Sequence, residues 1–321
     1  MKIRLMIALS ASLFSICCLA AEEKTSQPIV LSLPGLNWSL QISAPGFAME
    51  GFEVAPDGDA AHFAARNEKT EIMMTGYLEK AAKKGNAQEC RTFYWTKAQK
   101  SPFPKTDIKL SETGGMAIVE YMVKEFQGDH LDQKNINVYL AESDYWIDVH
   151  LSKTEYKPAD QQAFDAVLKS VRIEKNYKPS TFMLCYFGNV LFGQKKHAQA
   201  ATYYQQALNL ENDNRTLPRM AWLILVDQLG MSYGISGDIA KAKATYNAAI
   251  LKEPEYPMFY YNLACALAES NDRDGAIKNL NLAYKFKKNM LPGEEMPNPR
   301  TDSSFARFLN DKTFIGELDK M

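Results

Sequence analysis

Few residues of this 321-residue chain have the types and spacing that chemistry requires. The four histidines, His62, His130, His150 and His197, have neither an i, i+4 partner nor a Cys-x2-Cys pair beside them. The best metal candidate is Asp129-His130, with His150 expected on a neighbouring strand, but an ordinary surface or edge-strand role explains these histidines better. The sequence therefore predicts no metal site and no cofactor.

The cysteines do not point to catalysis either. Cys90 shares helical spacing with Phe93 and Tyr94, which predicts a buried side chain rather than a nucleophile. Cys185 and Cys265 fall in helices of the second half, and three cysteines after residue 21 do not indicate a disulfide framework. The chain has no phosphate-binding Gly-x4-Gly-Lys and no Gly-x-Gly-x2-Gly after a strand, and we expect no nucleophile elbow. These observations predict a protein that is not an enzyme.

The positions that determine the fold of the second half recur at a fixed interval. Leu229-Gly230-x2-Tyr233, Ala242-x3-Tyr246 and Ala249 return 34 residues on as Leu263-Ala264-x2-Leu267, Ala276-x3-Leu280 and Ala283, and an earlier copy reads Phe187-Gly188-x2-Leu191, Ala200-x3-Tyr204 and Ala207. Small and large residues at this spacing are typical of stacked helical hairpins. A stretch from Leu210 to Pro218 lengthens the first interval to 42 residues, which predicts a longer loop or an extended helix start, and we favour a polar loop there.

These residues resemble the tetratricopeptide repeat, over about residues 181–290. The resemblance implies three units of two packed helices, 181–214, 223–256 and 257–290, followed by a capping tail at 291–321. It also implies that the first helices line a concave, peptide-binding face. In this register the face carries Phe182, Tyr186, Asn189, Asp227, Met231, Met258, Tyr261 and Asn262.

The same resemblance argues against one kind of ligand. Family members that bind a terminal carboxylate use Lys, Arg and Asn on these helices, and only Asn189 and Asn262 match that pattern. Cys185, Gln228 and Met258 stand where cations or amides would be expected. An alternative is that the first domain or the C-terminal tail fills the face, which would make the array a structural brace.

The first half shows a different pattern. From residue 26 to 175, short β-rich runs alternate with turns, which predicts a separate α+β domain with an antiparallel sheet and two helices. Strands are expected at 29–33, 38–42, 61–65, 71–77, 108–111, 116–126, 136–141, 145–151 and 171–173, and helices at 87–99 and 159–170. The segment 145–149, followed by Phe164-x2-Val167-Leu168-x-Ser170-Val171, resembles the Mog1/PsbP-like fold, which implies an accessory or docking module.

The N-terminus and the charge balance bear on location and partners. Lys2 and Arg4 precede an apolar run that ends at Ala20-Ala21, as in a secretory signal peptide spanning residues 1–21. No other run approaches the length of a membrane span, so no integral membrane segment is expected after cleavage. A net charge of −1 without a basic cluster argues against nucleic acid as a partner.

The sequence thus predicts an exported, periplasmic or secreted, non-enzymatic adaptor or scaffold that binds a protein or peptide segment through its repeats. Two alternatives remain open. The first domain could hold a small-molecule or hydrolytic site with the repeats as support, or the chain could be a structural component of an envelope assembly in which the repeats self-associate.

Overall fold

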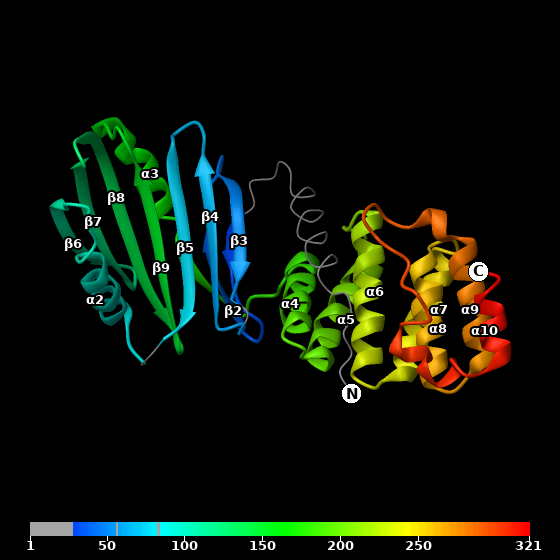
Figure 1. The fold of residues 1–321 in the computed structure, drawn as a ribbon. Coiled ribbons are helices and arrows are strands. Elements are labelled where there is room, and N and C mark those ends of the chain that lie inside the picture. The colour runs from blue at the N-terminus through cyan, green and yellow to red at the C-terminus, as the bar shows by residue number, and fades with distance from the viewer. Residues whose placement is uncertain (1–27, 56, 82–83) are drawn as a thin grey trace. The chain divides into compact units, whose positions relative to one another are not determined.

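The structure is a computed structural model that describes residues 28–55, 57–81 and 84–321. The described residues form two compact units, one ending at Lys178 and one beginning at Pro179, and each is described by itself. The predicted signal peptide, residues 1–21, lies outside the described residues. Figure 1 shows the elements of both units.

The N-terminal unit contains two antiparallel sheets. A three-stranded sheet has the order β1-β2-β10, with β1 at Ile29–Leu31, β2 at Trp38–Ile42 and β10 at Arg172–Lys175. A seven-stranded sheet has the order β3-β4-β5-β9-β8-β7-β6, with bounds Ala48–Val54, Ala60–Asn67, Ile72–Lys80, Tyr145–Lys153, Asp129–Glu142, Met116–Phe126 and Thr106–Thr113 respectively. All neighbouring strands of the large sheet are antiparallel (Figure 1).

The two faces of the large sheet are covered differently, and the alternation along β9 shows how. Ile147, Val149 and Leu151 point into a core that also contains residues of the small sheet and Phe164 of helix α3 (Gln161–Leu168). Trp146 points to the opposite face, where helix α2 (Ala87–Ala98) packs on β7, β8 and β9. Period-two alternation of buried side chains is expected when a sheet is covered on both faces. A short 3-10 turn, η1 (Pro158–Asp160), precedes α3.

The predicted fold class of this half is confirmed, but the unit has more strands than the sequence predicted, and they form two sheets. The missed strand, β3, is an edge strand with mostly exposed side chains, and a bulge between Met49 and Gly51 breaks its alternation. The small sheet depends on the pairing of β2 with β10, which are far apart in the chain. A local hydrophobic pattern carries no information about such a pairing.

The C-terminal unit is built from helical hairpins. Its long helices are α4 (Thr181–Gly193), α5 (His197–Asp213), α6 (Arg219–Ile235), α7 (Ile239–Lys252), α8 (Pro257–Glu269) and α9 (Arg273–Lys285). Shorter turns and a last helix follow: η2 (Lys287–Asn289), η3 (Ser303–Phe308) and α10 (Lys312–Leu318). Each long helix packs on the next one in sequence, as expected for a repeat array.

Glycine sets the distance between the paired helices. A Cβ atom on Gly188 of α4 would lie 2.4 Å from the ring of Tyr204 on α5, and one on Gly230 of α6 would lie 2.3 Å from the ring of Tyr246 on α7. Both tyrosine rings are buried, so neither can move away without disturbing its core. The small residues of the repeat therefore allow the close approach that the spacing predicted.

The polar loop expected at Leu210–Pro218 covers only residues 214–218, because most of the extra residues extend helices, including the start of α6. Helix α5 has 17 residues against 14 in α7, and α6 has 17 against 13 in α8. Glu211, which is 2 % exposed, accepts hydrogen bonds from the backbone N–H groups of Thr216 and Leu217, both at 3.0 Å. These bonds hold the short turn between the lengthened helices.

We expect Gly230→Ala to destabilise the C-terminal unit by about 1–3 kcal/mol in urea unfolding, since the new methyl group would overlap the Tyr246 ring. That loss should outweigh the gain of about 1 kcal/mol in helix propensity. The matched control is Gly234→Ala in the same helix, where the nearest atom is the Ala242 Cβ at 3.9 Å. Equal stabilities of the two variants would show that the close helix contact is not a constraint.

Candidate functional site

In the N-terminal unit, two polar groups lie together on the α2 face of β9. The Asp148 carboxylate accepts a hydrogen bond from Asn137 Nδ2 at 3.0 Å, and His150 Nε2 lies 3.0 Å from Asn135 Oδ1. Burial raises the pKa of Asp148 to about 6, with the Glu79 carboxylate adding to the rise and the Asn137 bond opposing it. Burial lowers the pKa of His150 to about 4, so this imidazole is neutral at pH 7. The hydrogen-bond partner of each group is an amide side chain and not a nucleophile.

The metal candidate from the sequence is not assembled. His150 is paired across the strands with Asn137, seven residues along β8 from His130, which corresponds to about 23 Å. Within residues 28–55, 57–81 and 84–321, no group of three His, Cys, Asp or Glu side chains could hold a metal ion.

Cys90 is buried, as predicted. Its thiol lies 3.6 Å from the carbonyl oxygen of Ile147, and burial, with a smaller contribution from Asp148, raises the thiol pKa well above its usual range. The thiolate required for nucleophilic attack is therefore strongly disfavoured. Cys90 acts as part of the core beneath α2.

One serine matches a nucleophile motif that the sequence analysis did not expect. Residues 230–234 read Gly-Met-Ser-Tyr-Gly, which has the residue types of the Gly-x-Ser-x-Gly elbow. A nucleophile elbow needs a sharp strand-to-helix turn that exposes the serine, whereas Ser232 lies in the last turn of α6 and is 0 % exposed. The motif match is a coincidence, because Gly230 is a repeat residue that allows the close contact with Tyr246.

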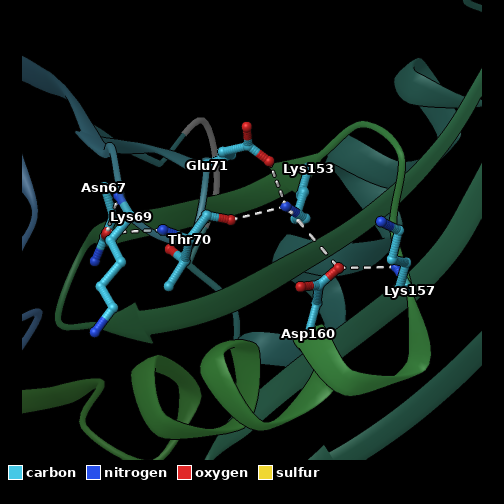
Figure 2. A network of polar contacts seen from close by, with 7 residues as sticks. All are labelled: Asn67, Lys69, Thr70, Glu71, Lys153, Lys157 and Asp160. Atoms are coloured by element: carbon cyan, nitrogen blue, oxygen red, sulfur yellow. Dashed lines mark hydrogen bonds and ion pairs between the residues drawn. The ribbon is translucent and has the colours of Figure 1, made fainter.

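Lys153 forms the centre of a polar network at one end of the large sheet (Figure 2). Its Nζ donates to the Thr70 carbonyl oxygen at 3.0 Å and to Glu71 Oε2 at 2.8 Å, and lies 3.9 Å from Asp160 Oδ2. The hydrogen bond from Lys153 lowers the pKa of Glu71. The network ties the β4–β5 turn to the segment before α3, which is a structural role.

A cavity of about 320 Å³ lies beside α3. Its lining is mostly apolar and includes Phe47, Ile72 and Val167. Thr70 Oγ1, from another lining residue, is buried and has no hydrogen-bond partner among the described residues. This is the feature of the N-terminal unit that best fits a small ligand.

The predicted binding residues of the C-terminal unit lie on α4, α6 and α8, which together form what we call the first-helix face. Two of them touch across neighbouring helices, because Asn262 Nδ2 on α8 donates to Asp227 Oδ1 on α6 at 2.6 Å. On α4, the rings of Phe182 and Tyr186 stack at 6.4 Å. The structure thus brings 227 and 262 together and places 182 beside 186.

Other members of the predicted set have internal partners. Asn189 Oδ1 accepts a hydrogen bond from the Tyr204 hydroxyl at 2.6 Å, so its amide helps to hold α4 against α5. Met231 and Met258 are half-buried against the cores of the array. Tyr261 is 1 % exposed, and its hydroxyl donates to Asp302 Oδ2 at 3.0 Å.

The partner of Tyr261 belongs to the tail, part of which crosses the first-helix face. The tail segment is residues 291–302, drawn in orange in Figure 1. Its Leu291 packs against the cores that contain α6 and α8. Glu294 Oε1 accepts from the Tyr256 hydroxyl at 2.6 Å. Asp302 accepts from Tyr261 and lies 3.7 Å from the Cys265 thiol. Beyond it, Phe305, Phe308 and Phe314 pack against α8 and α9 as a cap.

Two carboxyl groups share this part of the face. Burial, with a smaller contribution from the Glu294 carboxylate, raises the pKa of Asp227 to about 8, and the hydrogen bond from Asn262 opposes the rise. Burial also raises the pKa of Glu294. Among residues 179–321, no lysine or arginine forms an ion pair with Asp227, Glu294 or Asp302. The sequence analysis missed Glu294 and Asp302 because they lie in a proline-rich segment without periodicity.

The tetratricopeptide repeat family model matches residues 184–214 and 227–255, which contain most of the first two hairpins. The C-terminal half of the chain contains tetratricopeptide repeats. The third hairpin, α8–α9, lies outside the matched residues but places Ala264, Ala276 and Leu280 together in a buried core, as the repeat pattern requires. No curated protein matches the chain.

Three solved structures are similar to parts of the chain. YrrB, a tetratricopeptide repeat protein with an unusual peptide-binding site, is 18% identical over 40% of this chain and 60% of its own length, with a TM-score of 0.31. The tetratricopeptide repeat domain of Sgt2 from Aspergillus fumigatus is 21% identical over 44% of this chain and 82% of its own, with a TM-score of 0.32. A protein of Bacteroides thetaiotaomicron is 10% identical over 65% and 79%, with a TM-score of 0.33.

At these identities and TM-scores the likeness says nothing of what this chain binds. The matched part spans less than two thirds of YrrB. None of these three matches tests the resemblance of the N-terminal unit to the Mog1/PsbP-like fold, which stays a prediction. Within the described residues, no helix is both long and apolar enough to cross a membrane.

Asp227 should make the stability of the C-terminal unit depend on pH. Its native pKa of about 8 is above the value of about 3.9 expected in an unfolded chain, so folding favours the protonated form. This contribution is complete below about pH 4 and is lost as the pH rises towards 8. We expect Asp227→Asn, which keeps the acceptor for Asn262, to be about 1–3 kcal/mol more stable than wild type at pH 8.

The difference between Asp227→Asn and wild type should shrink steadily towards pH 4 in urea unfolding followed by circular dichroism. The isosteric control is Asp274→Asn, whose carboxylate is 79 % exposed. If wild type and Asp227→Asn lost stability in parallel between pH 4 and pH 8, the carboxyl group would not be the cause.

Proposed function

We propose that the chain is an exported, non-enzymatic adaptor that binds a protein or peptide segment on the first-helix face of its tetratricopeptide repeats. The observation that carries the proposal is the Asn262–Asp227 bond, which puts equivalent surfaces of neighbouring first helices side by side. Repeat arrays use such continuous surfaces to bind partners. The half-buried pair Phe182 and Tyr186 supplies an aromatic anchor at the α4 end of this face.

The non-enzymatic part of the proposal rests on the state of the reactive groups. The Cys90 thiol is protonated in a core, and Ser232 is enclosed within α6. His150 is neutral and bonded to an amide instead of activating a nucleophile. The export part rests on the signal-like composition of residues 1–21.

The small-molecule alternative for the N-terminal unit has one supporting observation, the cavity with the unpartnered Thr70 hydroxyl. The cavity volume of about 320 Å³ lies at the lower end of the range of about 300–1,000 Å³ that is usual for ligand pockets, so it suits only a small ligand. A bound small molecule in the native mass spectrum of the purified chain would favour this alternative.

Replacing Tyr186 with alanine should weaken partner binding by about 1–3 kcal/mol, or about 5- to 150-fold in Kd, if the ring is a hot spot. The measurement is affinity capture from the exported fraction with wild type and Tyr186→Ala, followed by titration of the recovered protein. The control is Leu251→Ala on α7, where the side chain is 86 % exposed. Equal recovery by Tyr186→Ala and wild type would exclude this anchor.

Export should leave a new N-terminus. We expect the chain recovered from outside the cytoplasm to begin at Ala21 or Glu22, because small residues precede signal-peptide cleavage sites. Intact-mass measurement of the chain, fractionated by compartment, gives the answer. A chain that keeps residues 1–21 and stays in the cytoplasm would contradict the proposed location.

A further inference from the structure

The tail segment lies on the first-helix face in the manner of a bound peptide. It contains no helix or strand between Leu291 and Asp302, and Pro292, Pro297 and Pro299 prevent one from forming. Leu291 supplies an apolar anchor, and the Glu294 carboxylate lies three residues further along. Met296 adds a second apolar contact, against the core that contains Tyr261. An extended segment with apolar anchors and spaced polar contacts is a common form of peptide recognition.

In the two tyrosine hydrogen bonds between the face and the tail, the face is always the donor and the tail always the acceptor. The face donates through the hydroxyls of Tyr256 and Tyr261, and the tail accepts through the carboxylates of Glu294 and Asp302. These donors are neutral side chains, and a carboxylate acceptor strengthens such bonds. A segment that replaced the tail would therefore need carboxylates at similar positions and an apolar residue in place of Leu291.

The contact between the tail and the face depends on the protonation of Asp227. Glu294 lies near Asp227, and the two carboxyl groups oppose each other only when Asp227 loses its proton, at about pH 8 and above. The aromatic cap formed by Phe305, Phe308 and Phe314 makes separate contacts with α8 and α9. Met296 of the tail packs against the same core as the cap, and Arg300 pairs with Asp319. Both contacts must also open when residues 291–300 leave the face.

We propose that the tail segment is a built-in competitor for the α6–α8 part of the first-helix face, and that the partner binds there through an extended acidic segment of the same chemistry. This inference rests on the proposed function and deepens it by naming the partner's docking element. The element has a leucine-like anchor followed three residues later by a carboxylate, with a second carboxylate beyond it. The partner must displace the tail to reach Tyr256 and Tyr261.

The test uses a fluorescent peptide with the sequence of residues 289–303, carrying R300Q to remove its tryptic site. A tethered segment has an effective concentration of about 1 mM, so the wild-type chain should bind the free peptide weakly. The full chain with Leu291→Ser and Glu294→Ala should bind it at least tenfold more tightly, because its own tail no longer competes. Glu295→Ala, at an exposed neighbouring position, is the matched control and should behave as wild type.

Adding Tyr256→Phe and Tyr261→Phe to the weakened chain should reduce peptide affinity again, because the rings remain and only the two donors are lost. Circular dichroism checks that each variant is folded. Equal peptide affinity in the weakened chain and wild type, or no binding to either, would overturn the proposal and identify the tail as a fixed cap.

A second measurement needs no variant of the chain. Limited trypsin digestion of wild type should cut after Arg300, which is exposed, faster as the peptide concentration rises. A cleavage rate that does not respond to the peptide would also overturn the proposal. Neither result depends on Tyr186, so Tyr186-dependent capture combined with a peptide-insensitive tail would refute this inference and leave the proposed function standing. Capture that did not depend on Tyr186, with a peptide-sensitive tail, would refute that anchor alone.

Discussion

The close contact between glycine on one helix and a tyrosine ring on the next is the constraint on which the C-terminal unit depends. At Gly188 and Gly230 any side chain would overlap the facing tyrosine ring, so the first two hairpins can close only with glycine there. The fixed hairpin spacing in turn places α6 and α8 side by side, close enough for Asp227 and Asn262 to form a hydrogen bond at 2.6 Å. The binding surface is therefore a consequence of core packing, and no loop is needed to build it.

This dependence explains which features the sequence could predict. The repeats could be predicted because small and large residues recur at a fixed interval. Strands such as β2 and β7 could be predicted because their β-forming residues are local in the sequence. The edge strand β3, which has a bulge and mostly exposed side chains, carries neither signal. The extension of α5 and α6 was also hidden, because the turn depends on a buried carboxylate, Glu211, that reads as a polar loop residue.

The sequence predicted which residues share the first-helix face, but not which of them bond to other parts of the array. The repeat pattern placed Asp227 and Asn262 on one face correctly, since equivalent positions of stacked hairpins must face the same way. It could not show that Asn189 is committed to Tyr204, or that Tyr261 is committed to Asp302. Those contacts depend on side chains from a second helix and from an aperiodic tail. Residues that bind a partner and residues that hold the array together have the same sequence signature here.

The intrachain contact has a consequence for affinity that follows from its energetics. Two hydroxyl-to-carboxylate hydrogen bonds contribute about 1.5–3 kcal/mol each at most, and the conformational entropy lost when the segment is ordered on the face offsets part of that. A net docking free energy of about 1.5 kcal/mol would lower a competitor's apparent affinity only about tenfold. A tail of this strength discriminates against segments that lack a carboxylate, because those lose the bonds that the tail makes, while it remains displaceable by an acidic segment that replaces them. A weakly bound tail would thus exclude segments that lack a carboxylate and still let an acidic segment bind.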